Sequence, residues 1–158
     1  MGIDPGLTGA VATIKLDPPT IMVINDIPVL AGQTKKHICP YMLSSIIRRH
    51  TRALGPYHIS LFVLEDVHSM PNQGVASMFK FGRTKGVIEG VLAGLSHKIT
   101  LISPQSWKKQ LALTKDKNAS RAMATKIFGT NEYWQRVKDD GRAEAALIAL
   151  AKGWRDEK

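Results

Sequence analysis

The sequence predicts an α/β protein in which a mixed sheet carries helices on its faces. Segments rich in β-branched residues, at 10–14 and 20–28, follow a Pro-Gly and an Asp-Pro-Pro turn signal and favour an antiparallel meander. After residue 38, helical and strand patterns alternate, which is typical of an α/β sheet. A chain of 158 residues, 44% of them hydrophobic, can form one compact core, so we expect a single domain over 1–158.

The chain begins with a short apolar strand that ends at Asp4. Pro5 and Gly6 then predict a tight turn, because proline fixes its φ angle and glycine tolerates a positive one. Asp4 would project from the strand end beside this turn. It either caps the turn through local backbone N–H groups or contributes a carboxylate to a site.

A helix is expected from about 38 to 54, after a polar loop at 32–36, with basic residues in its last turns and a stop at Gly55-Pro56. The apolar run at 59–64 predicts a central strand buried on both faces. This run ends in Glu65-Asp66. The acidic pair either marks the strand's exit into solvent or belongs to a site, because burying a carboxylate is costly without compensation.

A long helix is expected from about 74 to 95, and four glycines recur along it at every fourth residue. Each glycine costs roughly 1 kcal/mol relative to alanine inside a helix, so the stripe requires a packing reason. We expect it to admit close approach of the sheet or of a second subunit. The stripe comprises Gly82, Gly86, Gly90 and Gly94.

Residues 99–102 predict another short strand, and Ser103-Pro104 opens a helix. A basic loop at 114–118 and a helix at 120–128 follow. The last helix begins near Asp139 and has a body of small apolar residues. Asp140 and Glu144 differ by only about 40° around its axis, whereas Asp139 and Glu144 differ by about 140°. Asp140 is therefore the better partner for Glu144, unless these acids only stabilise the helix dipole.

The charge balance favours a polyanionic partner. Lys and Arg number 22 against 13 Asp and Glu, which gives a net charge of +9, and nucleic acid is the leading candidate. The lone Cys39 cannot form an internal disulfide, and no Cys/His spacing resembles a zinc site. No leader or membrane-length apolar run is evident, so we expect a cytoplasmic location.

Acidic residues therefore stand at three places: Asp4, Glu65, and the Asp140/Glu144 helix face. Gathered at one end of the sheet, these carboxylates would repel one another unless divalent cations bound between them. Ligand sets made only of oxygen favour Mg²⁺ or Mn²⁺. Two such ions are a common device for in-line displacement at a phosphodiester.

An ordered set of motifs carries a family resemblance over the whole chain. These are Gly2-Ile3-Asp4-Pro5-Gly6, Leu64-Glu65-Asp66-Val67, the helix around 79–86, Ser103-Pro104-Gln105-Ser106-Trp107-Lys108 and Asp140-Gly141-Arg142-Ala143-Glu144-Ala145. The sequence resembles the RuvC-type Holliday junction resolvases (crossover junction endodeoxyribonucleases) of the ribonuclease H-like superfamily, particularly their phage-encoded branch. The resemblance implies a ribonuclease H-like mixed sheet of five strands with helices on both faces.

The resemblance also implies the site residues. Asp4, Glu65, Asp140 and Glu144 would bind two Mg²⁺, for which Mn²⁺ would substitute, and Lys108 would stand beside the cleaved strand. The implied substrate is branched DNA, especially four-way junctions, and the implied assembly is a homodimer. The predicted DNA-binding residues are His68, Lys80, Arg83, Lys85, Lys108, Lys109, Lys115 and Lys117.

Three departures from the family pattern keep other functions open. Only three residues precede Asp4, so the native strand starts upstream or is curtailed; Gly141 stands where bacterial members favour Asp or His; and His68 aligns with their aromatic wedge. A non-catalytic branched-DNA binding module is the alternative from a different class. A related nuclease acting on flaps, forks or RNA-containing duplexes is the third possibility.

Overall fold

The computed structural model describes residues 1–31, 36–52, 61–68, 74–114 and 116–156. Its main sheet has five strands in the order β3-β2-β1-β6-β7. The first three strands along the chain pair antiparallel, whereas β1, β6 and β7 run parallel, as the sequence predicts. The strands are β1 (Gly2–Ile3), β2 (Ala10–Leu16), β3 (Pro19–Asp26), β6 (Phe62–Glu65) and β7 (Ile99–Ile102).

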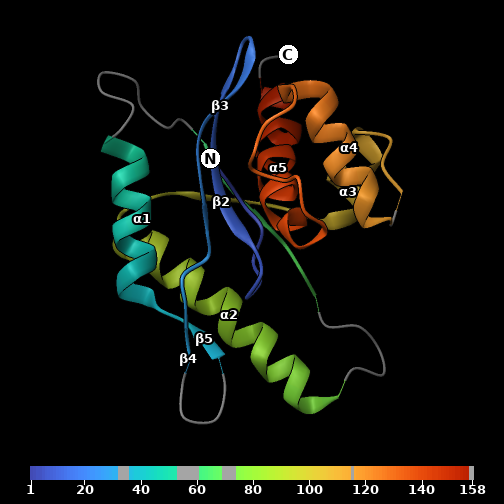
Figure 1. The fold of residues 1–158 in the computed structure, drawn as a ribbon. Coiled ribbons are helices and arrows are strands. Elements are labelled where there is room, and N and C mark those ends of the chain that lie inside the picture. The colour runs from blue at the N-terminus through green and yellow to red at the C-terminus, as the bar shows by residue number, and fades with distance from the viewer. Residues whose placement is uncertain (32–35, 53–60, 69–73, 115, 157–158) are drawn as a thin grey trace.

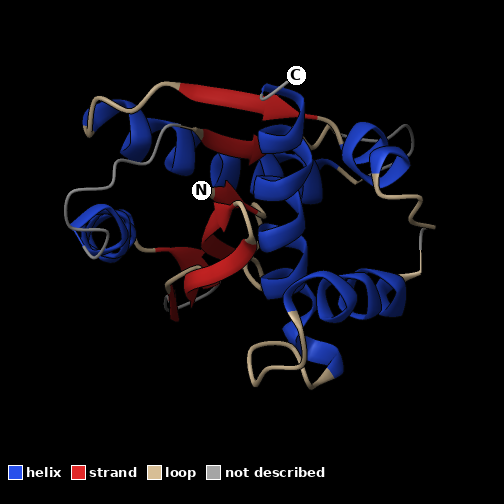
Figure 2. Cartoon of the chain, turned by 90° about the horizontal axis from the view of Figure 1, so that it is seen from above, coloured by secondary structure: helices blue, strands red, loops and turns tan. Residues whose placement is uncertain are grey.

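Helices cover both faces of this sheet (Figures 1 and 2). One face carries α1 (Pro40–Arg52) and α2 (Val75–Gly94). The other carries α3 (Pro104–Gln110), α4 (Lys117–Phe128) and α5 (Asp140–Asp156), the last preceded by the 3₁₀ turn η1 (Val137–Asp139). The fold class is therefore the predicted mixed α/β sheet with helices on both faces.

A small second sheet was not predicted from the sequence. Strands β4 (Val29–Ala31) and β5 (Lys36–Ile38) form an antiparallel hairpin that packs against α2. Lys36, which the sequence assigns to a loop at 32–36, instead pairs with Ala31 in this sheet, and the rest of that loop lies outside the described residues. Strands of three residues carry too little periodicity to be recognised from sequence. The predicted helix stop at 55–56 lies outside the described residues.

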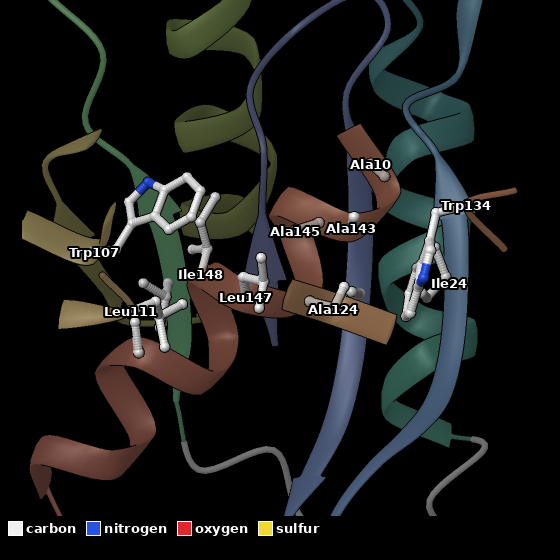
Figure 3. Packing of buried hydrophobic residues seen from close by; sticks show 14 of the residues in the cluster. Ala10, Ile24, Trp107, Leu111, Ala124, Trp134, Ala143, Ala145, Leu147 and Ile148 are labelled. Atoms are coloured by element: carbon white, nitrogen blue, oxygen red, sulfur yellow. The ribbon is translucent and has the colours of Figure 1, made fainter. Parts of the chain in front are cut away.

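Side-chain alternation along the strands divides the core into two clusters. Ile3 and Leu64 point toward α1 and α2, whereas Val63, Ala10 and Ala12 point toward α5. Figure 3 shows the α5 side, where Leu147 and Ile148 lie among residues from the sheet, α3 and α4. Residues that follow Ile3 and Leu64 directly therefore face α5, which decides where the acidic side chains at the strand ends point.

Helix α5 packs unusually close to the sheet, as its small-residue composition predicts. A Cβ atom on Gly2 would lie 2.1 Å from the carbonyl oxygen of Ala145 and 2.5 Å from the backbone nitrogen of Ala149. Only glycine fits there. This contact fixes the height of α5 above β1 and therefore the position of every side chain in its first turns.

The structure corrects two expectations about glycines. Among the described glycines only Gly129 has a positive φ angle, so Gly6 does not use one in the first turn. Gly9 is the constrained residue there, because a Cβ atom on it would lie 2.0 Å from the carbonyl oxygen of Asp4. The glycine stripe of α2 does not face the sheet either: a Cβ atom on Gly82, Gly86, Gly90 or Gly94 would meet no atom within 4 Å.

The short first strand is held on both sides by the sheet. β1 lies in the middle of the sheet, hydrogen-bonded to β2 and β6, and is not an exposed edge. The hydrogen bonding between β1 and β6 also includes the residue before β1, because the N–H of Val63 donates to the carbonyl of Met1 over 2.9 Å. Neighbours on both sides therefore fix Asp4 despite the brevity of its strand.

Candidate active site

The two strand-end carboxylates are brought together by the register of the parallel pair. Gly2 pairs with Val63 and Ile3 pairs with Leu64, so Asp4 and Glu65 are the next residues on adjacent strands. Both follow side chains that point to the α1/α2 face, and both consequently face α5. The sequence prediction that carboxylates meet at one end of the sheet follows from this register.

Asp4 is the most strongly perturbed acid of the group. Desolvation raises its pKa well above the usual value, and the negative charges of Glu65, Glu144 and Asp140 raise it further. The positive charge of Lys108 opposes these effects. Asp4 thus occupies the centre of an acidic cluster made of the four residues predicted from the sequence.

Glu65 is buried, and its orientation is set by α3. The indole nitrogen Nε1 of Trp107 donates a hydrogen bond to Oε1 of Glu65 over 2.7 Å. Burial raises the pKa of Glu65, and this hydrogen bond lowers it. Trp107 reaches the glutamate because Ser103, the N-cap of α3, accepts from the N–H of Ser106 and starts the helix directly after β7.

Glu144 has partners from two other helices. Nζ of Lys108 lies 3.2 Å from its Oε1, and the hydroxyl of Ser120 donates to the same oxygen over 3.0 Å. The ammonium group of Lys108 also stands 5.0 Å from the ring centre of Trp107. Lys108 thus pairs with Glu144, lies over the Trp107 ring and acts through its charge on Asp4 and Glu65.

The two neighbouring aspartates at the start of α5 have different surroundings. Both carboxylate oxygens of Asp139 accept from the guanidinium of Arg136 over 2.9 Å, and this partner lowers the pKa of Asp139. The negative charge of Asp140 instead raises the pKa of Asp4. The angular argument from the sequence therefore chose the aspartate that lies in the cluster. Arg142, the other charged residue of this turn, pairs with Asp26 across 2.7 Å.

Gly141 explains the departure from the family spacing. A Cβ atom at this position would lie 2.4 Å from the carbonyl oxygen of Thr8 and 2.9 Å from Oδ2 of Asp4. An aspartate or histidine side chain has no room there without moving the helix. Helix α5 contributes Asp140 and Glu144 to the cluster, and position 141 between them has room only for glycine.

The donor chemistry of this cluster suits hard divalent cations. Four carboxylates supply only oxygen ligands, and a cation among them would relieve the repulsion that raises the pKa of Asp4. Within the described part of the chain, however, no three His, Cys, Asp or Glu side chains already meet in a metal-binding geometry. The four carboxylate side chains would have to rotate before they could bind a cation together.

The predicted DNA-binding residues are distributed around the site. Lys80 and Arg83 are exposed on α2, and Lys109 is exposed on α3. Lys85 is less available, because it pairs with Asp66 and lies 3.7 Å from Oε1 of Glu89. His68 is 72% exposed and 3.1 Å from Asp66. Lys117 begins α4, and Lys115 lies outside the described residues.

Two residues of the site were not assigned a role from the sequence. Trp107 belongs to a motif that carries the family resemblance, but its bond to Glu65 depends on how α3 folds back over the strand. Ser120 gave no signal, because a serine early in an amphipathic helix is common. Its bond to Glu144 arises only because α4 packs on α5.

No protein-family model matches the sequence, and no curated protein matches it. Solved structures do match. Thermus thermophilus RuvC in complex with a Holliday junction substrate is 16% identical, with a TM-score of 0.67 over 99% of this chain and 92% of that chain. The chain has the fold of RuvC. A second Thermus thermophilus RuvC structure is 17% identical, with a TM-score of 0.62 over 99% of this chain and 93% of that chain.

At these identities the RuvC comparison establishes the fold, which is the ribonuclease H-like mixed sheet expected from the sequence. The similarity extends over nearly the full length of both chains, so the RuvC fold accounts for the helices on both faces as well as for the sheet. Across the described residues, no helix has the length and hydrophobicity to span a bilayer.

Proposed function

We propose that this protein is a divalent-metal-dependent DNA endonuclease that resolves four-way junctions and cuts other branched DNA. The single observation that carries the proposal is the acidic cluster around Asp4 in a chain of net charge +9. A strongly basic protein attracts DNA, whereas four adjacent carboxylates would repel it. Mg²⁺ or Mn²⁺ bound between the carboxylates would offset their repulsion of DNA. The RuvC fold supports the same proposed function.

Asp4, Glu65, Asp140 and Glu144 are the proposed metal ligands. Two ions held there would activate the attacking water and stabilise the leaving 3′ oxygen of the phosphodiester. The chain's own groups orient this set: Trp107 fixes Glu65, and Ser120 fixes Glu144. Lys108, now beside Glu144, would be released to contact the scissile phosphate once a metal ion replaces it at that carboxylate.

We also place the protein in the phage-encoded branch of the RuvC-type family and expect a homodimer. The order of motifs along the whole chain supports the branch. Two copies suit the paired incision of a four-way junction. The open glycine stripe of α2 offers a face on which a second backbone would approach without steric hindrance. The one cysteine, Cys39, is buried and free, which suits a reducing cytoplasm.

Substitution of the two neighbouring aspartates tests the proposal. We expect Asp140→Asn to reduce cleavage of a four-way junction by at least about a hundredfold without weakening junction binding in Ca²⁺, because it removes a metal ligand. Asp139→Asn is the matched control, since its partner is Arg136. It should lower the melting temperature and leave the cleavage rate of the folded protein nearly unchanged.

The same experiment separates the competing functions. Equal cleavage by wild type and Asp140→Asn would contradict the proposed ligand set. Junction binding without any Mg²⁺- or Mn²⁺-dependent nicking by wild type would favour the non-catalytic binding module. Faster cutting of flaps, forks or RNA-containing duplexes than of four-way junctions would favour the related nuclease.

A further inference from the structure

Arg48, Arg49 and Arg52 form an arginine stripe along the outer side of α1. All three side chains are exposed, and together with Ser45 they line a hollow of about 470 Å³. Residues three and four apart lie next to one another on a helix, so these four positions make one continuous strip over two turns. The buried residues of α1 lie on its other side, against the sheet.

No acidic side chain balances the arginine stripe within the described part of the chain, where none of its guanidinium groups has an ion pair. The sequence itself contains no Asp or Glu between Asp26 and Glu65. Arg48 and Arg52 stand one helical turn apart, where like charges repel each other. The helix dipole accounts for cations in the last turn, but Arg48 lies before that turn. An anion bound across the stripe would relieve the repulsion.

The arginine stripe and the acidic cluster lie on opposite sides of the sheet. The acids at the strand ends face α5, whereas α1 covers the other face (Figure 1). Helix α1 also runs away from these strand ends. The residue before it bonds Pro28, just past the end of β3, and its last turn bonds Thr13 in the middle of β2 through His50. A ligand on the stripe is therefore separated from the acidic cluster by the sheet.

The lining of the hollow favours the phosphate backbone of duplex DNA as the ligand. Guanidinium groups bind phosphate oxygens through paired N–H donors. The Ser45 hydroxyl already donates to the carbonyl of Tyr41 over 3.1 Å, so the arginines supply the donors. Among the described residues, no aromatic or apolar side chain lines the hollow. Unpaired bases would need aromatic rings to stack on, and a protein partner would need an apolar centre.

We propose that the arginine stripe binds the phosphate backbone of a second segment of duplex DNA, separate from the segment at the acidic cluster. This inference rests on the proposed function for the choice of DNA as the polyanion. A four-way junction has four duplex arms, so an arm that is not being cut is available as the second segment. Contacts to phosphates alone hold a duplex in place without reading its sequence.

The salt dependence of junction binding in Ca²⁺ measures how many phosphates the stripe contacts. The test variant is Arg48→Gln/Arg52→Gln, which keeps Arg49, whose charge acts on the buried His50. Each lost contact should reduce the slope of log affinity against log salt by about 0.9, so we expect a reduction of about 1.8. Between 50 and 200 mM salt, the affinity of wild type should therefore fall about twelvefold more than that of the variant.

Lys98→Gln/Lys126→Gln is the matched control. It removes the same charge from two exposed sites away from α1, and Lys126 lies in the last turn of α4, so a cation at a helix end is lost in both variants. The control should keep the wild-type slope. Equal slopes in the two variants would mean that net charge alone acts, which would overturn the inference.

Capture of two duplexes tests whether the stripe binds a second DNA segment. Two linear 20-base-pair duplexes, one carrying a donor dye and the other an acceptor dye, are mixed with the protein in Ca²⁺. Wild type and the lysine control should bring the dyes together and give energy transfer, whereas Arg48→Gln/Arg52→Gln should lose it. Energy transfer retained by the arginine variant would assign both duplexes to the acidic clusters of a dimer and overturn the inference.

Cleavage in Mg²⁺ separates this inference from the proposed function. Metal-dependent cleavage, with slope and energy transfer unchanged in the arginine variant, would overturn the inference and leave the nuclease intact. A slope that depends on the stripe in a protein that never cleaves would contradict the proposed function and leave the duplex site intact. Binding of poly-glutamate that depends on the stripe, with an unchanged DNA slope, would assign the stripe to an acidic protein and overturn the inference.

Discussion

At the scale of single residues, the strand-end carboxylates differ in how their charge is balanced. Asp4 is surrounded by like charges, whereas Glu65 has a direct donor in Trp107. Because a hydrogen bond to a carboxylate favours the ionised form, Trp107 keeps Glu65 closer to the state in which it binds a cation. An aromatic side chain of α3 thereby controls a proposed metal ligand on β6.

Replacing Trp107 should change how metal and protons compete at Glu65. Trp107→Phe removes a hydrogen bond to a charged group, which is typically worth about 1.5–3 kcal/mol, so the pKa of Glu65 should rise further. The Mg²⁺ concentration for half-maximal cleavage should then increase about tenfold at pH 6 and approach the wild-type value at pH 9. Titrations of cleavage rate with Mg²⁺ at the two pH values measure this effect.

Trp134→Phe is the control, because the Trp134 indole donates to Thr125 over 3.0 Å, away from the acids. It should leave the Mg²⁺ titration unchanged at both pH values. Equal shifts in the two variants would mean that Trp107 acts through general stability and not through Glu65.

Much of the residue-scale site could be predicted from sequence. Asp4 and Glu65 end apolar strand patterns, and helical spacing paired Asp140 with Glu144. The partners Trp107 and Ser120 could not be predicted, because their bonds join elements far apart in the chain. The role of Gly141 likewise depends on the backbone of Thr8, which no spacing rule reveals.

At the scale of elements, close packing of α5 on the sheet positions half of the acidic cluster. Gly141→Ala should therefore lower both stability and cleavage, because its methyl group would meet Thr8 and Asp4. We expect a loss of about 2–4 kcal/mol in the free energy of unfolding, as for other overpacked or strained buried sites. Chemical denaturation and single-turnover cleavage measure the two effects.

Gly90→Ala is the matched substitution on an open helix face. Its methyl group would meet no atom of its own chain within 4 Å, so it should stabilise α2 by up to about 1 kcal/mol through helix propensity. Equal destabilisation by both substitutions would contradict the close-approach explanation for Gly141.

Helix α1 is joined to the sheet through a buried histidine. Nδ1 of His50 lies 3.0 Å from the Thr13 hydroxyl and Nε2 lies 2.9 Å from Oδ1 of Asn25, and burial lowers the pKa of His50 from 6.5 to about 4. His50 lies in the last turn of α1, where the sequence predicts basic residues. The structure instead makes it a neutral core residue, because each ring nitrogen already has a polar partner.

This histidine predicts a defined pH dependence of stability. Between pH 4 and 6.5 the unfolded chain binds a proton at His50 that the folded chain does not, so stability rises with pH across this window and is complete above it. The contribution is on the order of 3 kcal/mol. Urea denaturation should show that His50→Gln loses this part of the pH slope, whereas His68→Gln, an exposed control, keeps it. An unchanged slope in His50→Gln would contradict the assignment.

Among the elements, the apolar strand β6 and the long helix α2 were predictable, the helix expected at 120–128 begins earlier at Lys117, and the β4–β5 hairpin was not predicted. The hairpin nevertheless forms one wall of a pocket beside α2. Its three-residue strands are fixed by pairing and by contact with the helix, so their existence depends on tertiary structure.

At the scale of the whole molecule, the fold and the net charge are both compatible with the proposed function. The net charge of +9 coexists with four carboxylates gathered at one end of a RuvC-like sheet. The sequence could not tell whether the glycine stripe of α2 faces the sheet or lies open, because the spacing of glycines does not identify the neighbouring element. Its place in a homodimer remains part of the proposal.

The most direct measurement is cleavage of a four-way DNA junction labelled on two opposing strands, by wild type and Asp4→Asn, with and without Mg²⁺. Linear, flap and three-way DNA serve as comparison substrates. The account predicts paired incisions in opposing strands by wild type only when Mg²⁺ is present, and junction binding without cleavage by Asp4→Asn. Cleavage by Asp4→Asn at the wild-type rate, or no metal-dependent cleavage of any branched substrate by wild type, would contradict it.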